Sequence, residues 1–380
     1  MKKNITIGID ARMWGNTQTG IGRYISSLSE EFFKQAPEIN FVLFMRDIKY
    51  IERYAHLKNI KPVKVKERWY SFGEQITLPA HFLNKNLDVL FVPHFNVPLI
   101  WRGKFVATIH DVTPLFFQGH LQKTSRIRAR AFRTVFSSTL RRAEHIIAVS
   151  SYTRDQITKN FGADSSRKIS VIHEGISDLS DKNIEENALT VHRAKMGISK
   201  PFIFFVGVWR PHKNITGLLE AFALIKKKFG DRYSLVLGGE EDIRYPEIRS
   251  TWERLGLEND IVRPGFIPDN ELPLWYKASA VVVIPSFVEG FGLVGLEAIK
   301  YGAFVAASNG GATPEILREA AAYFDPYNSV NMAEVVSNVL ENKEEQLRQK
   351  QESPKIIELY SWRESAAQTL NILRNAVSNR

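Results

Sequence analysis

Short apolar runs separated by polar or amphipathic segments recur along the chain and predict the strands of a parallel sheet. Within most of these runs the apolar residues are continuous, which is typical of parallel strands that helices cover on both faces, whereas the first run alternates apolar and small residues. In the first half of the chain these runs occupy residues 5–9, 41–44, 89–92, 105–109, 146–150 and 169–172. The segment from Gly20-Ile21-Gly22 to about Lys34 is predicted to form the first helix.

The same alternation of strands and helices starts again at Pro201, after a polar and acidic segment at 179–200 that we interpret as a linker. A chain of 380 residues is also too long for one ordinary core. The pattern therefore predicts an α/β protein with two Rossmann-like domains, at 1–178 and 201–360, whose parallel sheets face a ligand across a cleft. The second set of apolar runs occupies residues 202–207, 234–239, 261–262, 280–284, 304–307 and 323–325.

The composition narrows the cellular setting. The chain contains no cysteine, which excludes disulfides and thiolate metal sites and fits a reducing compartment. The first residues run directly into a predicted strand without the apolar segment of a secretory signal. No apolar run approaches the length of a membrane span. We therefore expect a cytoplasmic protein.

The net charge of +10 predicts an anionic partner. Basic residues are concentrated between Asp111 and Glu144, where there is no acidic residue. A predicted helix at 121–142 is either simply solvated on its basic face or contacts an anionic membrane surface or acceptor. We find no helix-turn-helix, zinc-finger or RNP pattern, so nucleic acid is not expected as a partner. The arginines that share this helical face are Arg126, Arg130, Arg133 and Arg141.

A glycine-rich loop from Pro285 to Leu293 joins the apolar run 280–284 to a predicted helix at 294–301. Backbone N–H groups of such a loop and of the helix that follows converge on an anion such as phosphate. Glu289 in the loop and Glu297 in the helix flank this position. Because carboxylates repel phosphate but accept hydrogen bonds from hydroxyls, the pattern indicates a nucleotide sugar as the ligand.

Two further clusters follow predicted strands, at the edge where open α/β sheets bind ligands. His110 and Asp111 follow the run 105–109, where they either bind a ligand or form only a capped turn. Arg210 and Lys213 follow the run 202–207 and are candidates for a diphosphate clamp. The next residue, Asn214, is predicted to cap a helix.

These motifs occur in the order found in one protein family. Over nearly its whole length the chain resembles the retaining GT-B glycosyltransferases of family 4, especially bacterial mannosyltransferases of polysaccharide and O-antigen assembly. The most specific element is the segment from Glu289 to Glu297, which has the spacing of the family's Glu-x7-Glu signature. Segment 361–380 resembles the family's C-terminal helix, which crosses back onto the first domain. The other matching motifs are Gly20-Ile21-Gly22-Arg23-Tyr24, Thr108-Ile109-His110-Asp111, Ala148-Val149-Ser150-Ser151-Tyr152-Thr153, Phe205-Val206-Gly207 with Lys213-Asn214, and Tyr360-Ser361-Trp362.

The resemblance implies a role for each motif residue of the second domain. Glu297 would bind the ribose hydroxyls, Glu289 would lie at the donor sugar, and Lys213 would neutralise the diphosphate. Many relatives have an arginine immediately before this lysine, whereas this chain has His212. Arg210 would take the place of that arginine as the second cation at the diphosphate. Backbone groups near Phe266 and Ile267 would contact the nucleobase. The backbone of the loop itself would hold sugar hydroxyls and phosphate, through Gly290, Phe291, Gly292 and Leu293.

In the first domain, the resemblance implies that Gly22 donates an N–H to the diphosphate and that His110 lies at the reacting face of the sugar. The reaction it implies is hexose transfer with retention of configuration. We find no Asp-x-Asp pair suited to a divalent ion, so we expect metal-independent transfer with the nucleotide sugar as co-substrate and no other cofactor.

The resemblance implies GDP-mannose as the donor, with a UDP-sugar as the alternative. The acceptor would be a growing glycan on a polyprenyl diphosphate, reached at the inner face of the cytoplasmic membrane through the basic helix 121–142. Three other functions remain open from the sequence: a glycoside hydrolase that uses the two glutamates, a sugar-nucleotide epimerase, and a non-catalytic subunit of a polysaccharide assembly complex.

Overall fold

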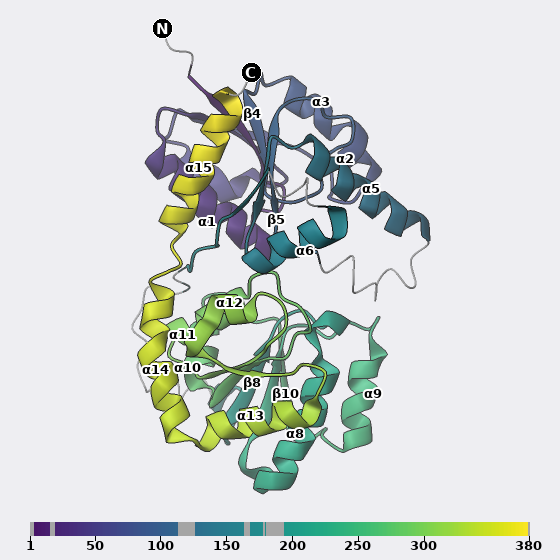
Figure 1. The fold of residues 1–380 in the computed structure, drawn as a ribbon, viewed down its shortest axis with the longest axis vertical. Coiled ribbons are helices and arrows are strands. Elements are labelled where there is room, and N and C mark those ends of the chain that lie inside the picture. Colours follow the sequence, from purple (N-terminus) through teal and green to yellow (C-terminus); the bar gives the residue numbers. More distant parts are fainter. Residues whose placement is uncertain are drawn as a thin grey trace. The chain divides into compact units, whose positions relative to one another are not determined.

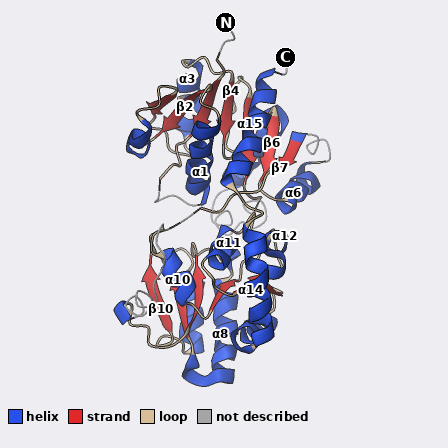
Figure 2. Ribbon diagram, turned by 90° about the vertical axis from the view of Figure 1, so that its left-hand side faces the viewer, coloured by secondary structure: helices blue, strands red, loops and turns tan. Residues whose placement is uncertain are grey.

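The computed structural model describes residues 4–15, 20–112, 126–162, 168–177, 179 and 194–378. The chain forms two compact units: residues 1–175 together with 361–380, and residues 176–360. Each unit consists of a parallel sheet with helices on both faces (Figures 1 and 2). Most of the predicted linker 179–200 and the first five residues of the predicted helix 121–142 lie outside the described residues.

The sheet of the first unit has seven strands in the order β3-β2-β1-β4-β5-β6-β7, and every described pair is parallel. The strand order reverses between β1 and β4, which are neighbours although β2 and β3 come between them in the sequence. The strands are β1 (Thr6–Asp10), β2 (Asn40–Met45), β3 (Ile60–Lys64), β4 (Val89–Val92), β5 (Phe105–Ile109), β6 (His145–Ala148) and β7 (Ile169–Val171).

The continuous apolar runs are explained by two separate cores, one on each face of this sheet. Phe41 and Leu43 of β2 pack into one core, whereas Val42 and Phe44 pack into the other. Successive side chains of a strand point to opposite faces, so a strand covered on both sides is apolar at every position.

Helices from distant parts of the sequence cover the first sheet. The C-terminal helix packs beside the first helix and adds Trp362, Leu370 and Leu373 to the same core as Phe32 (Figure 2). The helices are α1 (Gly20–Gln35), the 3₁₀ helix η1 (Ile48–Tyr54), α2 (Phe72–Ile76), α3 (Leu78–Leu83), α5 (Arg126–Arg142), α6 (Ser151–Phe161) and α15 (Trp362–Ser378).

Strand β3 is absent from the sequence prediction. It lies within a lysine-rich stretch and contains Pro62, which normally argues against a strand. The structure places β3 at the edge of the sheet, paired only with β2, where proline is tolerated and both faces are largely exposed. An edge strand needs no apolar run, so the pattern did not reveal it.

The sheet of the second unit has six parallel strands in the order β10-β9-β8-β11-β12-β13. The order reverses between β8 and β11. The strands are β8 (Phe202–Val206), β9 (Ser234–Gly238), β10 (Ile261–Gly265), β11 (Val281–Ile284), β12 (Val305–Ser308) and β13 (Ala322–Phe324). The helices are η4 (Pro211–Lys213), α8 (Ile215–Phe229), η5 (Gly230–Arg232), α9 (Pro246–Leu255), α10 (Leu272–Ala278), α11 (Leu293–Lys300), α12 (Thr313–Leu317), η6 (Arg318–Ala320), α13 (Ser329–Glu341) and α14 (Lys343–Ile357).

Helix α5 carries the basic face that the sequence predicts. Arg130, Arg133 and Arg141 are exposed, whereas the side chains of residues 126–129 lie outside the described residues. Arg142 points inward instead, where its Nε donates to Ser138 Oγ at 2.8 Å and its Nη2 to the Pro98 carbonyl at 3.1 Å. Among the described helices, none combines the length and the apolar character needed to cross a bilayer.

Candidate functional site

The glycine-rich loop lies where the strand order of the second sheet reverses. It begins at Pro285, directly after β11, and ends at Gly292, which precedes α11 and has φ +99°. An L-residue is disfavoured at that φ, so glycine is needed for the loop to turn into the helix. Leu293 is the first residue of α11, so the N–H groups of its first turn are those nearest the loop.

Two residues brought together from the loops after β8 and β11 form the charged centre of this site. Lys213 Nζ lies 2.6 Å from Glu289 Oε1. Ser286, a residue to which the sequence reasoning gave no role, donates its hydroxyl to the same oxygen at 2.5 Å. The Phe287 N–H donates to the His212 carbonyl at 2.9 Å and ties the two loops together.

Glu289 is ionised at neutral pH. Burial by itself raises the pKa of its carboxyl group, but the positive charge and hydrogen bond of Lys213, the Ser286 hydroxyl and His212 together hold this pKa below its usual value. The cation from the loop after β8 and the carboxylate from the loop after β11 thus form one compact ion pair.

Asn214 joins the loops of this site. Its side chain caps α8 by accepting from the Gly217 N–H at 3.2 Å, as the sequence predicts. Its Nδ2 also donates to the carbonyls of Pro285 and Pro326, at 3.1 and 2.7 Å. Asn214 has φ +52°, a conformation that asparagine tolerates better than most L-residues, and is only 3% exposed.

Two glycines to which the sequence analysis gave no role pack closely against the backbone of the loop. They follow β12, and a Cβ atom at Gly311 would lie 2.4 Å from the Glu289 N and 2.6 Å from its carbonyl oxygen. A Cβ atom at Gly310 would lie 2.4 Å from the Phe287 carbonyl oxygen. The Ala312 N–H donates to the Glu289 carbonyl at 2.9 Å. The Gly-Gly pair shortly after the apolar run 304–307 was the signal available in the sequence.

Glu297 is held in the second turn of α11. It is 3% exposed, and the Tyr276 hydroxyl donates to its Oε2 at 2.9 Å. Tyr276 lies on α10 and is itself fully buried, so it fixes the rotamer of the carboxylate. A buried, oriented carboxylate close to the end of β11 is suited to accept hydrogen bonds from two neighbouring hydroxyls of one ligand.

The remaining predicted residues of the second unit lie at the ends of neighbouring strands. Phe266 follows β10 and is 58% exposed, whereas Ile267 is buried against Gly238 at the end of β9. Arg210 precedes η4, and its charge acts on the nearby Tyr245. Arg210 therefore lies at the same strand end as Lys213, but no described contact joins it to Glu289.

In the first unit, the His110 ring contacts a carboxylate that lies 64 positions later in the sequence. His110 Nδ1 lies 3.0 Å from Glu174 Oε1, and Nε2 lies 3.1 Å from the Pro93 carbonyl. Because a carbonyl oxygen only accepts, the proton on Nε2 is fixed. Tyr24 meets the His110 ring edge-on at 4.6 Å. Gly22 is buried in the first turn of α1, the helix that the sequence predicts to begin at Gly20.

The comparisons with known proteins give the family. The model of glycosyl transferases group 1 matches residues 190–356, and the model of glycosyltransferase family 4 matches residues 18–178. Together these models account for both Rossmann-like units. The chain is a family 4 glycosyltransferase. The Glu-x7-Glu segment, Lys213 and Asn214 all lie in its group 1 region.

Two relatives of this glycosyltransferase are O-antigen chain mannosyltransferases. It is 28% identical to O-antigen chain mannosyltransferase B of Escherichia coli, over 93% of this chain and 95% of that protein. It is 26% identical to O-antigen chain mannosyltransferase RfbU of Salmonella typhimurium, over 71% of this chain and 70% of that protein. The structure of Anabaena Alr3699/HepE with UDP and glucose shares the GT-B fold, with a TM-score of 0.76 and 17% identity over 98% of this chain and 100% of that one.

The capping role of Asn214 gives a test of how this glycosyltransferase holds its loops. Replacing Asn214 with alanine is expected to lower the free energy of unfolding by roughly 2–3 kcal/mol, because it removes a helix cap and leaves two buried carbonyls without a donor. Asn328→Ala is the matched control, since Asn328 caps α13 from an exposed position and should cost only about 1 kcal/mol. Urea unfolding measures the free energy of unfolding of both variants. Equal losses of stability would contradict the proposal that Asn214 joins the loops of the site.

Proposed function

We propose that this glycosyltransferase transfers mannose from GDP-mannose, with retention of configuration and without a metal ion, to a lipid-linked glycan of bacterial surface polysaccharide. The observation that carries the proposal is the Lys213–Glu289–Ser286 cluster at the switch point of the second sheet. It combines a phosphate-binding cation with a hydroxyl-binding carboxylate, as a nucleotide sugar requires. The O-antigen mannosyltransferases among its relatives support mannose as the sugar.

The chemical task is to break the bond between the anomeric carbon and the diphosphate. Negative charge develops on the leaving diphosphate, and positive charge on the sugar. Lys213 and the N-terminal amides of α11 stabilise the diphosphate, while the ionised Glu289 accepts hydrogen bonds from sugar hydroxyls and stabilises the positive sugar. The acceptor hydroxyl attacks from the side of the leaving group, and a diphosphate oxygen takes its proton.

The other donor contacts follow from the same segment. Glu297, oriented by Tyr276, binds the two ribose hydroxyls, and backbone groups near Phe266 and Ile267 bind the base. The backbone of residues 290–293 binds the sugar and phosphate. His110, held by Glu174 and Pro93, orients the reacting groups and takes no part as a covalent nucleophile.

A thermal-shift screen tests the donor. Bound ligand stabilises the native state by mass action, so GDP-mannose and GDP are expected to raise the melting temperature more than UDP-sugars do. A larger shift with a UDP-sugar would contradict GDP-mannose as the donor while leaving glycosyl transfer intact. Conversion of the nucleotide sugar without any acceptor would indicate an epimerase instead, and NMR of the product anomer tests retention.

We also propose that α5 holds the enzyme at an anionic membrane surface, where a polyprenyl-linked acceptor is found. Arg130 and Arg133 supply exposed positive charge on one face. Arg130→Glu combined with Arg133→Glu is expected to reduce binding to phosphatidylglycerol vesicles severalfold, and added salt should weaken binding of the unaltered protein. Sedimentation of the protein with vesicles measures this, with Lys227→Glu on α8 as the control. Binding that neither the substitutions nor salt changes would contradict the proposal.

A further inference from the structure

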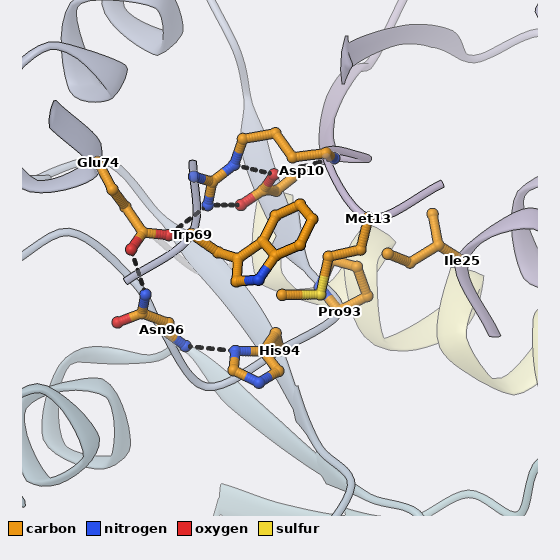
Figure 3. A pocket seen from close by; sticks show the side chains of 9 residues that line it. Asp10, Met13, Ile25, Trp69, Glu74, Pro93, His94 and Asn96 are labelled. Atoms are coloured by element: carbon orange, nitrogen blue, oxygen red, sulfur yellow. Dashed lines mark hydrogen bonds and ion pairs between the residues drawn. The ribbon is translucent and has the colours of Figure 1, made fainter. Parts of the chain in front are cut away.

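A small cavity in the first unit lies where β1 and β4 end. The strand order of this sheet reverses between these two strands. Ligands of open α/β sheets bind outside the carboxyl ends of the strands at such a switch point. The cavity is therefore in the position in the first unit that corresponds to the donor loop in the second. Its polar lining comes from Asp10, Arg12, Glu74, His94 and Asn96 (Figure 3).

Arg12 carries an unsatisfied donor at this cavity. Its residue is 5% exposed, and its Nε and Nη2 donate to the two Asp10 oxygens at 2.8 and 2.7 Å. Nη2 also lies 2.5 Å from Glu74 Oε1. Nη1 is buried and has no hydrogen-bond partner within the part of the chain that the structure describes. A buried donor without an acceptor is unfavourable, so a ligand atom that accepts from Nη1 would recover this lost stabilisation.

The size and charge of the cavity select the kind of atom that fits. Its volume is about 10 Å³, which is room for one hydroxyl-sized or water-sized group. Asp10 and Glu74 already face Arg12, and burial raises the pKa of Glu74 even though Arg12 opposes this. A phosphate or carboxylate would add a third negative charge and is disfavoured. A hydroxyl both accepts from Nη1 and donates to a neighbouring carboxylate oxygen.

Trp69 adds an aromatic face beside these polar groups. Its half-buried indole ring lies among Asp10, Met13 and Pro93 (Figure 3). The guanidinium of Arg46 lies 5.5 Å from the ring centroid and helps to hold it. An indole face packs against the C–H face of a sugar ring, while carboxylates and a guanidinium bind its hydroxyls. The lining therefore has both parts of a carbohydrate site.

The residues around the cavity are held in a strained and specific arrangement. Tyr70 has φ +59°, which is uncommon for a bulky residue, and its N–H donates to Glu74 Oε2 at 2.7 Å. Its hydroxyl lies 3.1 Å from His94 Nε2. Burial and the charges of His110 and Arg12 lower the pKa of His94 to about 3, so this histidine is neutral. His94 thus lies close to both Arg12 and the proposed catalytic His110, whose Nε2 bonds to the adjacent Pro93.

We propose that this cavity takes one hydroxyl of a neutral hexose at the growing end of the acceptor glycan, between Arg12 Nη1 and the carboxylates, with Trp69 against the sugar ring. The proposal rests on the proposed function and names the chemistry of its acceptor: the recognised group is an uncharged sugar, whereas any anionic part of the acceptor binds elsewhere. Its place beside His110 fits a hydroxyl that lies near the reacting group.

Titration of the full chain with methyl α-D-mannopyranoside, followed by ligand-observed NMR, tests the proposal. We expect Trp69→Ala and Arg12→Lys each to weaken binding about tenfold or more, and Trp69→Phe to keep most of it. Phe72→Ala is the matched control, since Phe72 is 90% exposed, lies three residues from Trp69 and does not line the cavity. If Arg12→Lys fails to fold, Trp69→Ala and Trp69→Phe still decide the result.

Two outcomes would overturn the proposal. Binding of the glycoside that is absent, or unchanged in Trp69→Ala, would mean that the cavity holds only a water molecule. Tighter binding of mannose 6-phosphate than of the neutral glycoside, lost in Trp69→Ala, would mean an anion site. Titration with GDP on the same samples separates this inference from the proposed function, because GDP binding depends on the second unit. If the unaltered protein does not bind GDP, the proposed function is contradicted, whether or not the glycoside binds.

Discussion

Lys213→Ala is expected to lower kcat/KM for sugar transfer by about 10²- to 10³-fold. Two effects combine in this loss. The leaving diphosphate loses its nearest cation, and Glu289 loses the ion pair at 2.6 Å that keeps its pKa low. The carboxylate then lies next to the diphosphate without compensation, so both donor binding and the chemical step become weaker. Steady-state kinetics with GDP-mannose, together with calorimetric titration of GDP, separate the two effects.

Lys227→Ala provides the control, because Lys227 is exposed on α8 of the same unit and lies outside the charged centre. Its kinetics are expected to match those of the unaltered enzyme. Lys213→Arg should recover part of the lost rate, since it restores the charge but not the compact geometry of the ammonium group. A Lys213→Ala enzyme with unaltered kcat/KM would show that the cation for the diphosphate comes from another residue, with Arg210 the first to test.

Gly311→Ala is expected to weaken donor binding by about 10²-fold while the protein stays folded. Its Cβ would lie 2.4 Å from the Glu289 N, so the loop must move, and displacements of this kind at a binding site are costly. The alanine at position 311 must also adopt a backbone φ of +71°, which is unfavourable for an L-residue. Calorimetry with GDP measures the affinity, and thermal melting measures the stability.

Gly302→Ala separates the two contributions of that substitution. Gly302 has a similar φ of +79° and no atom within 4 Å of an added Cβ, so its replacement costs only the backbone strain, about 1 kcal/mol. Donor affinity is expected to stay unchanged in Gly302→Ala. If both variants bind donor equally well, the close approach of Gly311 does not control the loop.

The strands were predictable because burial on both faces of a sheet leaves a simple trace in the sequence. β8 and β11 are runs in which every residue is apolar or nearly so, and both were found. β3 left no such trace, because its position at the edge is a property of the whole sheet. The capping by Asn214 and the turn at Gly292 were predictable for a similar reason: each depends on a few adjacent residues.

The contacts that complete the sites were not predictable in this way, because they join residues that are distant in the sequence. Glu174 reaches His110 across 64 positions, and Arg12 reaches Glu74 across 62. The local sequence around each of these residues does not predict which distant residue it contacts. Only the order of the strands brings the ends of β1 and β4 together and so forms the cavity beside Trp69.

The sequence by itself determined the two α/β units, the glycine-rich loop between β11 and α11, and the types of residue that we propose bind a nucleotide sugar, since all of these depend on local periodicity and spacing. The tertiary structure decided how those residues act. It pairs Glu289 with Lys213 and Ser286, it packs the loop against Gly310 and Gly311, and it buries Arg12 Nη1 without a hydrogen-bond partner among the described residues, beside a small cavity that Arg12 lines. Burial and charge at each of these places depend on chain segments that meet only after folding.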